Sequence, residues 1–148
     1  MGISGTRQVA TYTRQVGAGT GDVEYVTRAA SGNEWSGYRV LAGDRSNPQK
    51  LAAAGNLSAD ASGNALIAAT DVQPPAGTAP VPREFYLAAG DTLFTGPRPH
   101  PAGISGTTAQ LTDAGDGQRW WTTPVGGSSH LWFASRSAGA DPVYGTPK

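Results

Sequence analysis

The strongest constraint on the fold is a period-two pattern that runs from Arg83 to Gly96. Phe85 and Leu87 point to one side of an extended chain, and Tyr86 and Ala88 point to the other. A second arm is expected at 92–94, after an Ala-Gly-Asp turn at 89–91. Glycine there accepts a positive φ, and aspartate can bond to nearby backbone. The pattern predicts a β-hairpin around which the rest of the chain packs.

Short segments rich in β-forming residues recur along the chain, separated by turns rich in glycine and proline. The 148 residues include 21 Gly and 11 Pro, about twice the average usage for glycine. The spacing predicts about nine or ten short strands and hardly any helix. Segment 49–54 is either one turn of helix or an edge strand. The predicted fold class is all-β, an antiparallel β-sandwich or a jelly-roll-like barrel. The other strand segments are expected near 6–16, 23–28, 34–41, 65–70, 108–112, 119–123 and 131–136.

The length predicts a single β domain over residues 1–148. Two proline-rich stretches, 71–82 and 96–103, are expected to be extended loops or arms, because proline cannot donate to a strand ladder. Residues 137–148 are expected to form a loop-like tail with at most one short strand near Val143.

Charge and composition weaken several classes of function. Eleven Lys and Arg balance eleven Asp and Glu, so a general electrostatic attraction to nucleic acid or to an anionic membrane is not expected. No apolar run of some 18 residues is present, so a membrane-spanning helix is not expected. The N-terminus lacks the apolar core of a signal peptide, so a signal peptide is not expected either. The chain contains no cysteine, which excludes disulfides and thiolate chemistry.

Residues that could catalyse a reaction are few and scattered. His100 lies between two prolines, and His130 follows two serines at the start of a predicted strand. Asp113 and Asp116 stand beside glycines but lack the further oxygen ligands of a calcium loop, so a turn is the favoured interpretation. No nucleophile elbow, phosphate loop or dinucleotide fingerprint occurs. We therefore expect no enzymatic activity, no cofactor and no metal site.

Aromatic residues are the best candidates for binding. Arg119-Trp120-Trp121 and the segment containing Trp132 are predicted to form adjacent antiparallel strands. Because Trp120 and Trp121 are consecutive, one faces inward and the other outward. An outward indole is either an anchor in a protein interface or a platform for a sugar, or it is covered by the chain itself. Trp35 is the further candidate for the sugar platform.

The phrase Leu87-Ala88-Ala89-Gly90-Asp91-Thr92-Leu93, in a cysteine-free chain rich in Gly, Ala and Thr, resembles hairpins of small bacteriophage virion proteins. That resemblance implies a capsid decoration, tail or fibre component whose partners are other virion subunits, including copies of itself. A carbohydrate-binding module in an extracellular protein, using Trp120 or Trp121 with Trp35, is the alternative. A β-barrel enzyme is the third interpretation.

Overall fold

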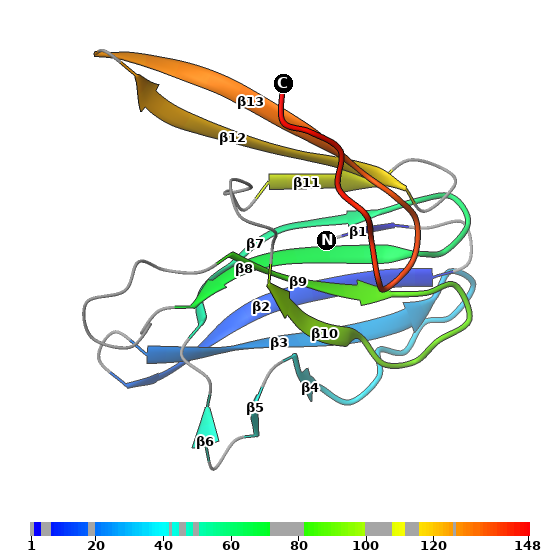
Figure 1. The fold of residues 1–148 in the computed structure, drawn as a ribbon. Coiled ribbons are helices and arrows are strands. Elements are labelled where there is room, and N and C mark those ends of the chain that lie inside the picture. Colours follow the sequence, from blue (N-terminus) through cyan, green and yellow to red (C-terminus); the bar gives the residue numbers. More distant parts are fainter. Residues whose placement is uncertain are drawn as a thin grey trace.

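The computed structural model describes residues 2–3, 7–17, 20–41, 43–44, 47–48, 51–71, 82–99, 108–111, 116–125 and 127–148. Most of the predicted loop at 71–82, residues 100–103 of the second predicted loop with His100, and the turn containing Asp113 lie outside these residues. The described part of the chain is all-β, as predicted, and contains no helix (Figure 1).

Thirteen strands occur among the described residues, four of them only two residues long. They are β1 (Gly2–Ile3), β2 (Arg7–Gly17), β3 (Thr20–Ala29), β4 (Arg39–Val40), β5 (Gly43–Asp44), β6 (Asn47–Pro48), β7 (Leu51–Ala59), β8 (Ala65–Asp71), β9 (Pro82–Leu87), β10 (Thr95–Pro99), β11 (Thr108–Leu111), β12 (Gly117–Val125) and β13 (Ser128–Arg136).

The strands form three antiparallel sheets and one short ladder. The first sheet has the order β1-β2-β3-β4, the second β10-β9-β8-β7 and the third β11-β12-β13, while β5 pairs with β6. Within each sheet the neighbours are consecutive in the sequence. Every sheet is therefore a meander built from local connections.

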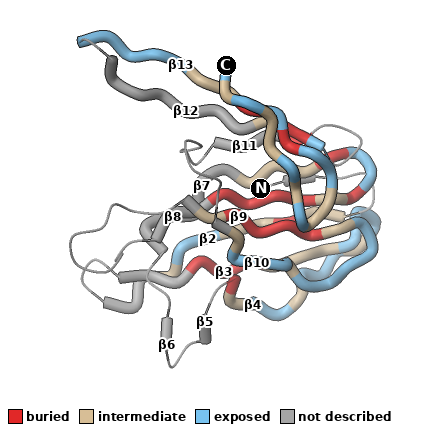
Figure 2. Tube along the Cα trace, in the orientation of Figure 1, coloured by how far each residue is buried: buried red, intermediate tan, exposed pale blue. Residues whose placement is uncertain are grey.

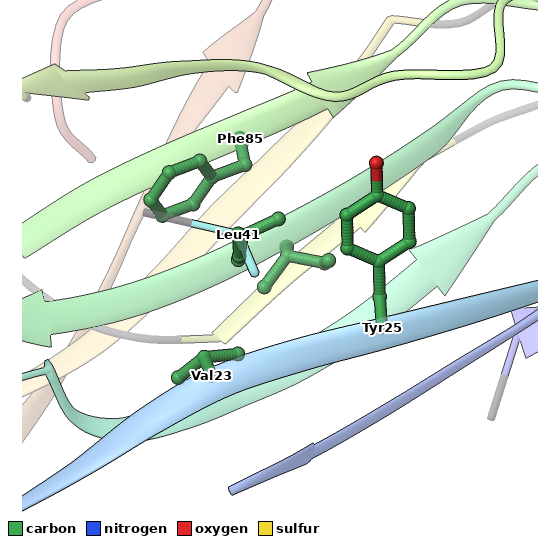
Figure 3. Close-up of a cluster of buried hydrophobic side chains, with 5 residues drawn as sticks. Val23, Tyr25, Leu41 and Phe85 are labelled. Carbon is green, nitrogen blue, oxygen red and sulfur yellow. The ribbon is translucent and has the colours of Figure 1, made fainter. Parts of the chain in front are cut away.

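The first and second sheets pack face to face around a shared core. Val23 and Tyr25 of β3 contact Ile67 of β8 and Phe85 of β9, with Leu41 completing the cluster (Figure 3). The rings of Tyr25 and Phe94 meet edge to face with their centroids 4.8 Å apart. A second cluster joins Val9 of β2 to Ala65 and Leu87.

The opposite face of the second sheet is also buried. Leu66, Ala68 and Tyr86 pack with Leu111 of β11, against which the C-terminal Ala140 also lies. The backbone N–H of Leu111 donates to Oγ of Ser58 at 2.8 Å. Strands β8 and β9 are therefore covered on both faces (Figure 2), which explains why Phe85, Tyr86 and Leu87 are all apolar.

The predicted hairpin is present, but its second arm begins later than expected. Thr95, the first residue of β10, pairs with Tyr86, and residues 88–94 form the connection. Arg7 holds this connection, because its guanidinium donates to the carbonyl oxygens of Ala88, at 2.5 Å, and of Asp91. The same guanidinium reaches the carbonyl of Gly63 in the β7–β8 turn, at 2.9 Å from Nη2.

Three further expectations can be compared with the structure. The strand expected at 34–41 is reduced to β4, since the hydroxyl of Ser36 accepts from the N–H of Thr27 at 3.0 Å, where a neighbouring strand would supply a carbonyl. Residues 51–54 of the segment 49–54 belong to β7, an edge strand of its sheet, which is one of the two alternatives expected for that segment. The start of the loop expected at 96–103 belongs to β10, another edge strand, where proline removes no ladder bond.

Gly96 occupies a bulge in the β9–β10 pair that accepts only glycine. Its φ is +133°, and a Cβ there would lie 2.7 Å from the carbonyl oxygen of Glu84. We expect Gly96→Ala to lower the free energy of unfolding by roughly 1 to 3 kcal/mol from the backbone conformation alone. Urea denaturation followed by tryptophan fluorescence measures the change.

Gly37→Ala is the matched control, since no atom lies within 4 Å of the added methyl. It should change the unfolding free energy by less than about 0.5 kcal/mol. Equal destabilisation by the two substitutions would contradict the steric assignment of Gly96.

Candidate subunit interface

A buried ion pair fixes the base of the β12–β13 hairpin to the second sheet. Arg136, the last residue of β13, donates from Nη2 to Oε1 of Glu84 on β9 at 2.8 Å, and from Nε to both carboxylate oxygens at 3.2 and 3.3 Å. Both side chains are almost completely removed from solvent. Because an isolated buried charge is costly, each residue requires the other.

The C-terminal segment completes the shell around this pair. Arg136 also donates to the carbonyls of Ser137, at 3.0 Å, and Gly139, at 2.8 Å. The hydroxyl of Tyr144 donates to Oε2 of Glu84. The guanidinium and the carboxylate thus both have several partners, and residues 137–144 are held by the same charges.

Tyr86 lies against this cluster. The guanidinium carbon of Arg136 is 5.0 Å from the centre of the Tyr86 ring, a cation–π contact. Burial raises the pKa of the Tyr86 hydroxyl above its usual range, while the charge of Arg136 acts in the opposite direction. The phenol is therefore held neutral in the folded protein.

The C-terminal residues also pair with β13 through backbone. Tyr144 forms a bridge with Arg136, the N–H of Gly145 donates to the carbonyl of Ser135 at 2.9 Å, and Phe133 and Lys148 exchange two hydrogen bonds of 3.0 and 2.9 Å. This edge of β13 is therefore covered from Arg136 to Phe133.

Beyond these contacts, β12 and β13 continue as a two-stranded ribbon that projects past the end of β11 (Figure 1). Among the residues that the structure describes, pairing of β11 with β12 extends only as far as Trp120. The ribbon, residues 121–125 and 128–132, has a continuous register that ends at Val125 opposite Ser128.

The two edges of the ribbon differ chemically. In an antiparallel ladder, alternate residues direct their N–H and C=O groups to the same side. Since Phe133 directs these groups to Lys148, Leu131 and Ser129 direct theirs to the same edge, where no described residue bonds to them. On the other edge, Pro124 stands opposite Ser129 and has no N–H to offer.

The β13 edge of the ribbon carries none of the features that usually block strand addition. Residues 128–132 contain no proline, lysine, arginine or carboxylate. Leu131 is 64% exposed. His130, near the end of the ribbon, is exposed as well. Within the described part of the chain, this edge has no hydrogen-bonded neighbour and is available for pairing with a further strand.

The structure brings four of the five predicted contact residues together. Arg119, Trp120 and Trp121 lie in β12, where the structure describes their backbone but not their side chains. Trp121 is the direct cross-strand neighbour of Trp132. Trp132 is half-buried beside Ala134 and Tyr144. Trp35 lies in the β3–β4 connection, on the far side of the second sheet from β12 (Figure 1). A surface that combines Trp35 with Trp120 or Trp121 is therefore not formed.

Sequence reasoning missed Leu131, Glu84 and Arg136. Leu131 could have been found as the first apolar residue after the Gly-Gly-Ser-Ser turn. Nothing in the sequence joins Glu84 to Arg136, because 52 positions separate them.

The described residues contain no group of three or more histidines and carboxylates that could hold a metal ion. Within the same part of the chain, no helix is long and apolar enough to cross a membrane. Comparison with family models, with curated proteins and with solved structures finds no match to this chain.

Removing Arg136 should be costly, because it leaves the Glu84 carboxylate buried without its cation. We expect Arg136→Met to lower the free energy of unfolding by roughly 3 to 5 kcal/mol. The double variant Glu84→Leu/Arg136→Met should recover most of that loss. Chemical denaturation of the single and double variants measures the coupling.

Arg98→Met is the control, since Arg98 pairs with Asp141 of the tail at an exposed site. It should cost no more than about 1 kcal/mol. A double variant as unstable as the sum of its two single variants would contradict the assignment of a mutually dependent buried pair.

The raised pKa of Tyr86 predicts a loss of stability in alkali. Its contribution is complete below the unfolded pKa of about 10 and disappears as the pH rises through the folded pKa. Above pH 10 the free energy of unfolding should therefore fall less in Tyr86→Phe than in the unmodified protein. Urea titrations at pH 8 and 11 test this, with Tyr38→Phe, at an exposed position, as control. Parallel pH dependence of all three proteins would refute it.

Proposed function

We propose that this protein is a non-catalytic structural component of a virus particle, a capsid decoration, tail or fibre protein, that acts through contacts between subunits. The observation that carries the proposal is the open β13 edge of the projecting ribbon. An isolated two-stranded ribbon is marginally stable in water, so a strand from a neighbour would both cover its edge and stabilise it. Extracellular display is the alternative location.

The neighbour that this edge fits best is a second copy of the chain. Ser129 and Leu131 direct their backbone groups to the same side, so two copies can pair antiparallel about a two-fold axis through His130. Ser129 of each copy then lies opposite Leu131 of the other, and each such pair exchanges two backbone hydrogen bonds. The contact would begin where pairing with Lys148 ends and stop at the turn.

The finer fold that we propose is a β-sandwich formed by the first and second sheets, with the third sheet as an additional layer. Their shared core supports this description. A jelly roll would place sequence neighbours in alternating sheets, whereas the order within both sheets is consecutive, which favours the sandwich.

Proline at the open edge should weaken self-association without disturbing the β12–β13 ladder, because the N–H of Ser129 points away from β12. We expect Ser129→Pro to raise the dissociation constant of the oligomer about tenfold or more, from the loss of two symmetry-related hydrogen bonds. Leu131→Lys should act in the same direction, because charges on an edge strand oppose pairing. Sedimentation velocity over a wide range of concentration measures both.

Ser129→Thr is the control, since it keeps the N–H and should associate normally. Retention of the far-ultraviolet circular dichroism spectrum and of the melting temperature would show that each variant is folded. An unmodified protein that stays monomeric at all concentrations, or a Ser129→Pro variant that associates as strongly as Ser129→Thr, would refute pairing through this edge.

A further inference from the structure

The outer face of the first sheet carries exposed aromatic rings next to charged side chains. Val9 points into the core, so its neighbours in β2, among them Gln8 and Tyr12, point to the outside. Arg28 of β3 stands opposite Gln8 and donates to its side-chain oxygen. This face lies on the side of the molecule away from the ribbon (Figure 1).

Trp35 lies over one end of this face. Its ring is 4.9 Å from the guanidinium carbon of Arg28, and the side chain is 37% exposed. The next residue, Ser36, is tied to Thr27 by a backbone hydrogen bond of 2.8 Å and by the 3.0 Å bond to its hydroxyl. The loop therefore presents the indole in a fixed position.

Tyr12 marks the other end and is 40% exposed. It stands opposite Glu24, whose buried carboxylate lies 3.1 Å from Nε of Arg14. Four residues along β2 separate Tyr12 from Gln8, a distance of roughly 13 Å at the usual rise of a strand. Between them lie Ala10 and Val26, which are directly paired and only half-buried. Aliphatic side chains therefore lie between the two aromatic residues, and we call this strip of the outer face the lane.

The charges along the lane are unequal. Glu24 is paired with Arg14 at the Tyr12 end. Arg28 contacts Gln8 and Trp35 at the other end, and no carboxylate among the described side chains pairs with it. The Trp35 end therefore combines a flat apolar ring with a guanidinium that has bonding capacity left for an anion.

We propose that this lane binds an acidic oligosaccharide. Pyranose rings stack on Trp35 and Tyr12, because their C–H faces match the electron-rich faces of aromatic side chains. A sugar carboxylate pairs with Arg28 through a charge-assisted hydrogen bond. The residues involved are separate from the ribbon, so this site does not depend on the proposed subunit contact.

The probe is a hexasaccharide of galacturonic acid, with a hexasaccharide of neutral glucose units for comparison, titrated by isothermal titration calorimetry. The acidic sugar should bind at least tenfold more tightly than the neutral one. Trp35→Ala should weaken its binding tenfold or more, and Tyr12→Ala severalfold, whereas Tyr12→Phe keeps the ring and should bind normally. Arg28→Gln should remove the preference for the acidic sugar.

Leu93→Ala serves as the control, because Leu93 is an exposed apolar residue in the β9–β10 connection of the second sheet. Ser129→Pro should bind the acidic sugar like the unmodified protein, which separates this proposal from that of self-association. Absence of binding at millimolar sugar, equal binding of the two sugars, or undiminished binding by a folded Trp35→Ala variant would overturn the proposal. Thermal unfolding of each variant shows whether it is folded.

Discussion

The architecture of the C-terminal half depends on the contact between Glu84 and Arg136. Glu84 projects from β9, the strand with apolar neighbours on both faces, into the layer formed by β11, β13 and the tail. A carboxylate there would be strongly disfavoured alone. Arg136 neutralises it, Tyr144 donates a hydrogen bond to it, and the carbonyls of residues 137 and 139 accept two further N–H groups of the guanidinium. A charge on the central sheet thus determines where β13 ends and where the tail must lie, which a purely apolar contact would leave less defined.

Two surfaces on different sides of the molecule remain available to partners. Strands β8 and β9 are covered on both faces, so they offer no surface to a partner. The two available surfaces lie in the outer layers, at the β13 edge and on the outer face of β2 and β3. The two proposed binding surfaces offer different chemical groups. The ribbon offers backbone groups in a row, whereas the lane between Trp35 and Tyr12 offers rings and a guanidinium. In the proposed role as a particle component, the protein would attach to its neighbours through one surface and display the other outward, without competition between the two contacts.

Local patterns in the sequence were sufficient for the all-β class and for the hairpin at β9 and β10, because alternation and turn chemistry act over a few residues. Local patterns did not predict the ends of strands where a hydrogen bond from a residue elsewhere in the chain replaces the bond that a neighbouring strand would make. The strand expected at 34–41 is shortened by a hydroxyl of Ser36, and the connection after Leu87 is lengthened by bonds from Arg7, more than 80 positions away. For the candidate contact residues, adjacency predicted the pairing of β12 with β13. It could not predict that the second sheet separates Trp35 from them, since layer order is decided by the complete core.

The direction of the ribbon follows from the same non-local contacts. Its two strands leave the body at Trp120 and Phe133, where β11 and the C-terminal residues stop pairing. At the base of the ribbon, β11 pairs with the edge of β12 and the C-terminal residues pair with the edge of β13. The ion pair between Arg136 and Glu84 also fixes the end of β13 to the second sheet. Further out, the two edges differ in their backbone donors. Pro124 has no N–H on the β12 edge, whereas Ser129 and Leu131 each have an N–H on the β13 edge. Because a donor is missing on the β12 edge and present on the β13 edge, strand addition is favoured on one side of the ribbon. Addition on one side only gives a defined complex, whereas addition on both sides would allow open-ended aggregation.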